Sequence, residues 1–225
     1  MLPALLLALQ LTSAEAHYRE GVRLFEAGKS ADAAARLEQA LRLAPNNAQY
    51  AKVLGVAYAA QKDYASAIKP FSTACEHDPA LLDACYFLGR AFYALDRYEP
   101  AIAALDRALQ HATNKPRSRL GKAQALEALG HAAEAEMQYL SALTEPDARI
   151  YYGQFLFRSG RLEPALEVLS QAKQTELAHY QIGRVLYQLG RLDEAIKNLK
   201  AAPNVNEAKL LLDKAYRRLG STTSR

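Results

Sequence analysis

Tyrosine and arginine recur together at two places in the chain. The same pattern, Tyr-x3-Arg-x2-Tyr, occurs at Tyr86/Arg90/Tyr93 and at Tyr180/Arg184/Tyr187. Spacings of three and four residues place the side chains of each triplet on one face of a helix. Tyr and Arg dominate binding hot spots because they combine a large contact area with polar tips. The pattern indicates a surface for a peptide with apolar and acidic groups. The alternative is that the rings pack against a neighbouring helix.

The histidines show no metal-binding or catalytic pattern. They are scattered through the chain, at His17, His77, His111, His131 and His179. No two of them are four residues apart, and the sequence has no HExxH, GxxxxGK[ST] or GxSxG motif. We therefore expect no catalytic residues, no metal site and no cofactor, and the chain is not expected to be an enzyme.

Two cysteines, Cys75 and Cys85, lie ten residues apart on either side of the turn signal Asp78-Pro79. We expect Cys75 in the last turn of one helix and Cys85 in the first turn of the next. A disulfide requires Cα atoms about 4.4–6.8 Å apart, which this placement allows. The favoured interpretation is two small buried thiols. A disulfide is the alternative, and an oxidising compartment would permit it.

An internal repeat indicates the helices that position these residues. A glycine column starts at Gly21, advances by 34 residues to Gly55 and Gly89, and then reaches Ala123. Steps of 30 lead on to Gly153, Gly183 and Asp213. Two alanine columns keep the same phase, at Ala33, Ala67, Ala101, Ala135, Ala165 and Ala195 and at Ala40, Ala74, Ala108, Ala142, Ala172 and Ala202. A column of large apolar residues runs between them, at Leu37, Phe71, Leu105, Tyr139, Leu169 and Leu199.

These columns predict units of two antiparallel helices. A glycine inside a helix costs about 1 kcal/mol relative to alanine, so its recurrence indicates close approach between helices. A column of turn-like residues follows seven positions later, at Gly28, Lys62, Asp96, Gly130, Gly160, Gly190 and Gly220. One helix pair cannot bury its apolar face alone, so neighbouring pairs must stack. The change from 34 to 30 residues predicts shorter second helices or tighter turns in the later units.

The chain resembles the tetratricopeptide repeat family. The second unit matches at Leu54, Gly55, Tyr58, Ala67, Phe71, Ala74 and Pro79, and the first at Gly21, Leu24, Ala33, Leu37, Ala40 and Pro45. The resemblance implies an all-α fold, a right-handed superhelical solenoid of about six two-helix repeats plus a C-terminal capping helix. It also implies a concave surface that binds ligands.

The repeat defines the expected domain organisation. The tetratricopeptide repeat domain is expected at 17–220, with units at about 14–47, 48–81, 82–115, 116–145, 146–175 and 176–205 and a capping helix at 206–220. Residues 221–225 are expected to be a disordered tail. Positions three before, one after and four after the glycine column should line the concave groove. The predicted partner-binding residues are Tyr18, Phe25, Lys52, Tyr86, Arg90, Tyr93, Gln154, Phe157, Tyr180, Arg184 and Tyr187.

The first sixteen residues, MLPALLLALQLTSAEA, suggest an export signal. An apolar run ends in the small-x-small sequence Ala14-Glu15-Ala16, after which signal peptidases cut. We expect cleavage there, a mature chain beginning at His17, and a periplasmic or extracellular location. The alternative is that residues 1–16 form a capping helix of a cytoplasmic protein.

The composition limits the classes of fold and partner that remain possible. The chain has 225 residues, of which 50% are hydrophobic, and a net charge of +4. It can bury a core, and it has no apolar run of the roughly 18–20 residues that span a bilayer. The small charge does not favour nucleic acid. We expect a non-enzymatic scaffold that binds a protein or peptide in the bacterial cell envelope. The alternatives are a docking or regulatory subunit of a separately encoded enzyme, and an RNA-binding helical repeat. The oligomeric state is not predicted.

Overall fold

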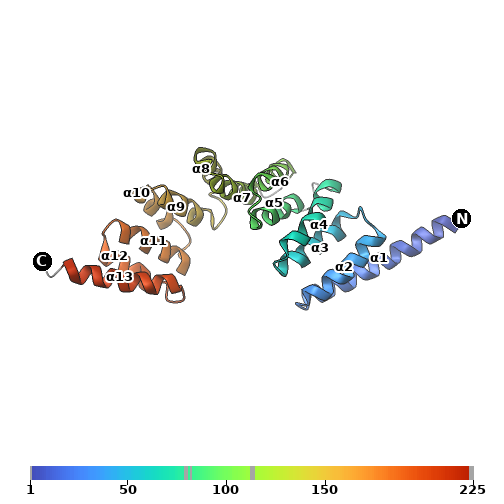
Figure 1. The fold of residues 1–225 in the computed structure, drawn as a ribbon, viewed down its shortest axis with the longest axis horizontal. Coiled ribbons are helices and arrows are strands. Elements are labelled where there is room, and N and C mark those ends of the chain that lie inside the picture. The colour runs from blue at the N-terminus through green and yellow to red at the C-terminus, as the bar shows by residue number, and fades with distance from the viewer. Residues whose placement is uncertain (1, 79–80, 82, 112–114, 223–225) are drawn as a thin grey trace. The chain divides into compact units, whose positions relative to one another are not determined.

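A computed structural model describes residues 2–78, 81, 83–111 and 115–222, with side chains described from residue 13 to residue 220 of these ranges. Within them the chain forms thirteen α-helices, and no strand is assigned (Figure 1). The chain divides into two compact units, Met1–Ala135 and Glu136–Arg225. The predicted all-α fold of consecutive helix pairs with a final capping helix is confirmed. Met1, the side chains of the apolar run at 2–12, and residues 223–225 of the predicted tail lie outside the described residues.

Consecutive helices pack against each other in the first unit, from α1 with α2 to α6 with α7. The helices that begin in this unit are α1 (Leu2–Glu26), α2 (Ser30–Leu43), α3 (Ala48–Ala60), α4 (Tyr64–His77), α5 (Ala84–Ala94), α6 (Tyr98–His111), α7 (Lys115–Ala128) and α8 (Ala132–Ser141). In the second unit α9 packs on α10, α10 on α11, α11 on α12 and α12 on α13. These helices are α9 (Ala148–Arg158), α10 (Leu162–Ser170), α11 (Glu176–Gln188), α12 (Leu192–Lys200) and α13 (Asn206–Thr222).

The glycine column makes room for the large apolar column. A Cβ built on Gly21 would lie 2.6 Å from Cγ of Leu37, and one on Gly89 would lie 2.6 Å from Cγ of Leu105. Both contacts join the first and second helices of one pair. The predicted close approach is therefore real, and a large side chain of the second helix fills the space.

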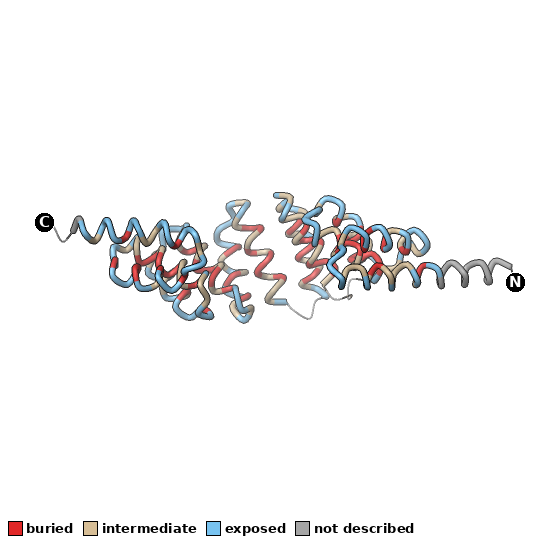
Figure 2. Tube along the Cα trace, turned by 90° about the horizontal axis from the view of Figure 1, so that it is seen from below, coloured by how far each residue is buried: buried red, intermediate tan, exposed pale blue. Residues whose placement is uncertain are grey.

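The alanine columns lie in the core. Every alanine of the two columns is at most 6% exposed. Small side chains at these positions let the helices pack closely while the large apolar column fills the remaining volume. Figure 2 shows buried residues recurring along the helices, whereas the connections between them are mostly exposed.

The turn column ends each first helix in the left-handed backbone region. φ is positive at Gly28, Gly130, Gly160 and Gly190, and also at the non-glycine residues Lys62 and Asp96, where it is 61° and 56°. Gly220 is the exception, because it lies inside α13 rather than at a turn.

The second helix of each pair is shorter in the later repeats, as the change of repeat length predicts. α2, α4 and α6 each have 14 residues. α8 has 10 residues, and α10 and α12 have 9 each. The residues removed from the repeat are thus largely taken from the second helix.

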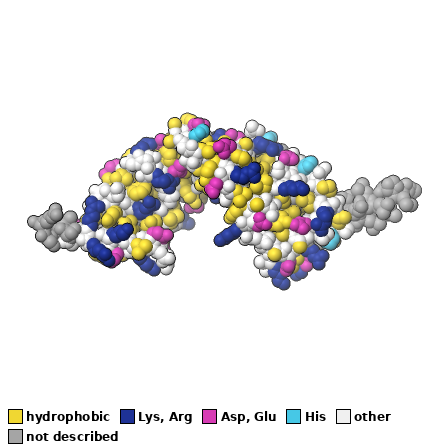
Figure 3. Space-filling view, viewed as in Figure 1, with side chains coloured by type: hydrophobic (Ala, Val, Ile, Leu, Met, Phe, Trp, Pro, Cys, Tyr) yellow, Lys and Arg dark blue, Asp and Glu magenta, His cyan; other side chains and the backbone are white. Residues whose placement is uncertain are grey.

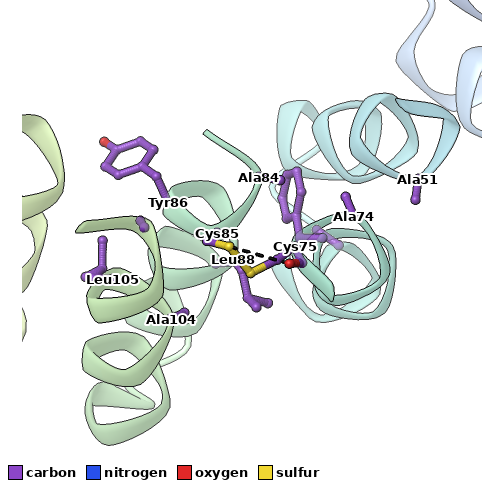
Figure 4. Close-up of a cluster of buried hydrophobic side chains, with 13 residues drawn as sticks. Ala51, Ala74, Cys75, Ala84, Cys85, Tyr86, Leu88, Ala104 and Leu105 are labelled. Atoms are coloured by element: carbon purple, nitrogen blue, oxygen red, sulfur yellow. Dashed lines mark hydrogen bonds between the residues drawn. A yellow bond between two sulfur atoms is a disulfide. The ribbon is translucent and has the colours of Figure 1, made fainter. Parts of the chain in front are cut away.

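Cys75 and Cys85 form a disulfide (Figure 4). The favoured interpretation as two free thiols is therefore wrong. Cys75 lies near the end of α4 and Cys85 at the start of α5. The Cα atoms of the two cysteines lie 4.8 Å apart, within the range that a disulfide needs. The bond is buried, with Cys75 at 0% and Cys85 at 2% exposure.

Candidate functional site

The predicted binding residues lie on the first helix of each pair. We call this set of positions, three before, one after and four after the glycine column, the first-helix stripe. In the first unit it lies on α1, α3, α5 and α7, and in the second unit on α9, α11 and α13. Figure 3 shows hydrophobic, basic and acidic side chains side by side on one face of the molecule.

The side chain of Arg90 on α5 contacts a neutral amide and an aromatic ring. Its Nη1 donates a hydrogen bond of 2.7 Å to Oε1 of Gln124 on α7, which holds the equivalent position on the next first helix. Its guanidinium carbon lies 5.4 Å from the centroid of the Tyr93 ring. The side chain is half-buried. Among the described residues Arg90 forms no ion pair, so its charge has no carboxylate partner there.

Tyr86, the other member of this triplet, is mostly covered. It is 8% exposed, and the guanidinium carbon of Arg117 lies 4.4 Å from its ring centroid. Arg117 also pairs with Asp83 at 3.7 Å. Tyr86 therefore belongs more to the packing than to an open surface, which bears out in part the alternative for the aromatic rings. Arg117 was not predicted as a site residue.

The stripe on α1 is built around stacked tyrosines. The ring centroids of Tyr18 and Tyr50 are 4.6 Å apart, and Gln49 Nε2 donates to the Tyr18 hydroxyl at 3.1 Å. The Tyr50 hydroxyl donates to Glu15 at 2.8 Å. Burial, and then the hydrogen bond to Glu15, raise the pKa of Tyr50 to about 12. Tyr18 is half-buried.

The other predicted residues of the first unit have simpler surroundings. Phe25 is half-buried and packs against the apolar cluster formed between the first two helix pairs. Lys52 is half-buried and forms no hydrogen bond or ion pair with any described residue. Tyr93 is half-buried, with its ring centroid 5.6 Å from that of Tyr98.

Arg184 of α11 lies against two aromatic rings of the second unit. Its guanidinium carbon is 4.6 Å from the Phe157 centroid on α9 and 5.6 Å from the Tyr180 centroid on α11. Its Nη1 donates to Oε1 of Gln181 at 2.8 Å. Like Arg90, it is half-buried and forms no ion pair within the described ranges. Gln154, also predicted, is half-buried on α9.

Tyr187 connects the stripe to the capping helix. Arg218 of α13 lies with its guanidinium carbon 5.3 Å from the Tyr187 centroid, and its Nη1 donates to the Tyr187 carbonyl at 3.2 Å. The structure thus brings Phe157, Tyr180 and Arg184 together directly and joins Tyr187 to α13.

Arg90 and Arg184 differ from the ion-paired arginines of the chain. Exposed arginines such as Arg23, Arg191 and Arg217 each bind a carboxylate three or four residues away. Arg90 and Arg184 instead bind the amide oxygen of a glutamine. A guanidinium has five N–H donors in a planar fork that matches a carboxylate. Chemically, the stripe can therefore bind a carboxylate beside apolar groups.

Sequence reasoning missed Gln181, Arg117 and Arg218. The repeat nevertheless carries a signal for some of these contacts. Tyr18 and Gln49 are 31 residues apart, as are Tyr86 and Arg117. In both pairs, the tyrosine lies three residues before one position of the glycine column. The residue that contacts it lies six residues before the next position of that column. This offset relates first helices of neighbouring pairs and is visible in the sequence.

The chain matches family models along most of its length. Two tetratricopeptide repeat models match residues 18–81 and 58–124. A model described as anaphase-promoting complex, cyclosome, subunit 3 matches residues 138–202. No curated protein sequence matches the chain. None of the helices in the described part is long and apolar enough to cross a membrane.

Solved structures share the fold at low sequence identity. PilW, described as a widely conserved type IV pilus biogenesis factor, has a TM-score of 0.76 at 18% identity, with 88% of this chain and 98% of PilW covered. Pseudomonas aeruginosa pilF has a TM-score of 0.72 at 17% identity, with 93% and 99% covered. A tetratricopeptide repeat protein from Parabacteroides merdae has a TM-score of 0.68 at 18% identity, with 90% and 84% covered. With its repeat columns, helix pairs and family matches, the chain is a tetratricopeptide repeat protein, a scaffold for protein–protein interaction.

Proposed function

We propose that the chain recruits protein or peptide partners through the first-helix stripe, with Arg90 in the first unit and Arg184 in the second unit each acting as a separate anchor for acidic groups. The observation that supports this most strongly is that both guanidinium groups bind neutral glutamines rather than carboxylates. Apolar groups of the partner would contact the neighbouring rings, such as Tyr93 and Phe157.

The surroundings of the arginines favour binding. An arginine that is already ion-paired must give up that pair before it can bind a partner, and within the described ranges Arg90 and Arg184 have no such pair to break. The aromatic rings also restrict the guanidinium groups, which reduces the entropy lost on binding. A hydrogen bond to a charged group contributes about 1.5–3 kcal/mol, so each arginine should account for at least about a tenfold change in affinity.

Selection from a peptide library tests the proposal and needs no identified partner. Random peptides displayed on phage would be selected on the full chain, and the affinity of selected peptides measured by fluorescence anisotropy. We expect acidic residues beside apolar ones, and a loss of affinity of at least about tenfold in R90Q for peptides that bind the first unit and in R184Q for peptides that bind the second.

The matched controls are R23Q and R191Q, which remove the same charge from exposed, ion-paired arginines outside the stripe. They should leave affinity within twofold. Equal loss in the controls would indicate unspecific charge attraction and refute the anchors. Unfolding of both R90Q and R184Q, seen by circular dichroism, would assign these arginines to folding instead.

We also propose that the chain functions in an oxidising compartment, the bacterial cell envelope. The Cys75–Cys85 disulfide supports this, because disulfides are rare in the reducing cytosol. The apolar segment at the start of the sequence and the likeness in fold to pilus biogenesis factors agree with it. Fractionation of cells that produce the chain should recover it in the envelope, with no free thiol after denaturation. Cytoplasmic recovery with two free thiols would contradict the proposal.

A further inference from the structure

The positive charge of the chain is concentrated at its C-terminal end. Residues 191–225 contain eight basic and four acidic residues, a net charge of +4. The preceding 190 residues contain 20 of each sign and are neutral, so this end accounts for the whole net charge. Lysine and arginine side chains gather over α12 and α13 in Figure 3.

α13 turns its apolar side inward and its basic side outward. Ala208 and Ala215 are buried, and Leu211, Leu212 and Leu219 pack on the same cluster against α12. Leu210 lies away from this side and is 68% exposed. Lys214 is exposed and forms no ion pair with any described residue, whereas Arg217 is paired with Asp213 at 2.8 Å.

The stripe on α13 repeats the arrangement on α11. Tyr180 and Leu210 lie three residues before positions 183 and 213 of the glycine column and offer apolar surface. Arg184 and Lys214 are basic and lie one residue after those positions. The two helices are direct neighbours, because Arg218 of α13 contacts the Tyr187 ring and carbonyl on α11. The second unit therefore presents two successive pairs, each with one apolar residue and one cation that has no carboxylate partner among the described residues.

Resting on the proposed function, we infer that the second unit binds an extended acidic segment of a partner protein in which acidic residues recur every third position, each beside an apolar residue. Packed helices lie about 8–10 Å apart. In the extended polyproline II conformation a chain advances about 3.1 Å per residue with three residues per turn, so every third side chain faces the same side and three residues span about one helix spacing. Successive acidic residues would then reach Arg184 and Lys214, with their apolar neighbours at Tyr180 and Leu210.

Two other occupants fit this surface less well. A second copy of the same end would oppose like charges, which disfavours self-association. A membrane-bound helix buries a broad apolar face in the lipid. The apolar side of α13 is already packed against α12, and Leu210 and Tyr216 are its large apolar residues that remain exposed among those described.

The test compares two peptides of the same composition on the full chain by isothermal titration calorimetry. The first contains two Leu-Glu-Ser triplets, which place the glutamates three apart, and the second has the two glutamates adjacent. The first should bind at least about fivefold more tightly. R184Q should weaken it at least about tenfold and K214Q about fivefold to tenfold, whereas K214Q should barely affect the second peptide, whose adjacent glutamates do not reach both cations. K173Q, an exposed charge change outside the first helices of this unit, should stay within twofold of the unaltered chain.

Each other outcome overturns a distinct claim. If R184Q weakens binding of the first peptide and K214Q does not, successive acidic residues do not bind α11 and α13 in turn. Arg184 then remains supported as an anchor. If neither variant changes binding of the first peptide, both claims fail for this unit. If K214Q instead abolishes sedimentation with vesicles containing phosphatidylglycerol and leaves both peptides unaffected, α13 binds anionic lipid and the inference is overturned.

Discussion

The ring of Phe71 fills the space that a side chain at Gly55 would occupy. A Cβ on Gly55 would lie 2.6 Å from Cδ1 and Cε1 of Phe71. Phe71 is 1% exposed, so its ring has little room to move aside. This contact joins α3 to α4, and equivalent contacts occur at Gly21, Gly89, Gly153 and Gly183. The glycine column is thus a packing requirement of the helix pair.

Gly55→Ala should lower the free energy of unfolding by about 1–3 kcal/mol, the usual effect of overpacking a buried contact. Urea denaturation followed by circular dichroism measures it. Gly220→Ala is the matched control, because Gly220 is helical and a Cβ there meets nothing within 4 Å. It should be neutral or slightly stabilising. Equal destabilisation by both substitutions would refute the packing account.

Reduction of the Cys75–Cys85 disulfide should destabilise the first unit. The bond closes a short loop across ten positions of sequence, for which chain-entropy arguments give about 3 kcal/mol. Urea unfolding with and without dithiothreitol should show this difference. The variant C75S/C85S should unfold like the reduced chain, and dithiothreitol should not change its stability. A reduced chain as stable as the oxidised one would show that the bond constrains nothing.

A chain that begins at His17 should be less stable than one that begins at Ser13. The predicted cleavage after Ala16 removes Ala14, which is 0% exposed in contact with the Ala40 and Tyr50 cluster, and Glu15, which accepts a hydrogen bond from the Tyr50 hydroxyl. We expect a melting temperature lower by at least about 3 °C. Equal melting temperatures would show that these contacts contribute nothing to stability. N-terminal sequencing of the exported chain tests the cleavage itself.

Three tyrosines should ionise only at high pH. Burial, with a hydrogen bond to a glutamate as the second cause, raises the pKa of Tyr50, Tyr58 and Tyr152 to about 12. Their hydroxyls donate to Glu15, Glu38 and Glu136. Because the folded pKa lies above the unfolded value near 10, this stabilisation is complete below about pH 10 and is lost as the pH rises through 12.

Absorbance of tyrosinate against pH measures this directly. Three of the 13 tyrosines should titrate near pH 12 together with alkaline unfolding. E136Q should bring the pKa of Tyr152 down only partly, since burial is the larger cause. If all tyrosines titrate near pH 10 in the folded chain, these hydroxyls are not held as described.

The repeat made most of the fold predictable from the sequence. Columns that stay in phase fix the helix pairs, and the loss of four residues per repeat correctly predicts the shorter α10 and α12. The turn column extends to Lys62 and Asp96, whose left-handed backbone follows from their place in the column and not from their residue types. Gly220 departs from the column because α13 continues through it to Thr222.

Features that depend on how neighbouring helices meet were harder to predict. The disulfide depends on how α4 and α5 meet, and Asp83, directly before α5, has a φ of 66° that its residue type does not indicate. The Arg90–Gln124 bond depends on side-chain rotamers across two helices. The repeat spacing places Arg90 and Gln124 on the first-helix stripe but does not predict a hydrogen bond between them. By spacing Tyr86 is equivalent to Tyr180, yet Arg117 covers it.

The most direct test of the central claim is photo-crosslinking of a selected peptide from chosen surface positions. A photoreactive p-benzoylphenylalanine would replace Phe157 on the first-helix stripe, or Leu43, which is 36% exposed on the second helix α2. We predict crosslinks from position 157 that R184Q abolishes, and none from position 43. Crosslinks from position 43 with none from position 157 would contradict binding through the first-helix stripe.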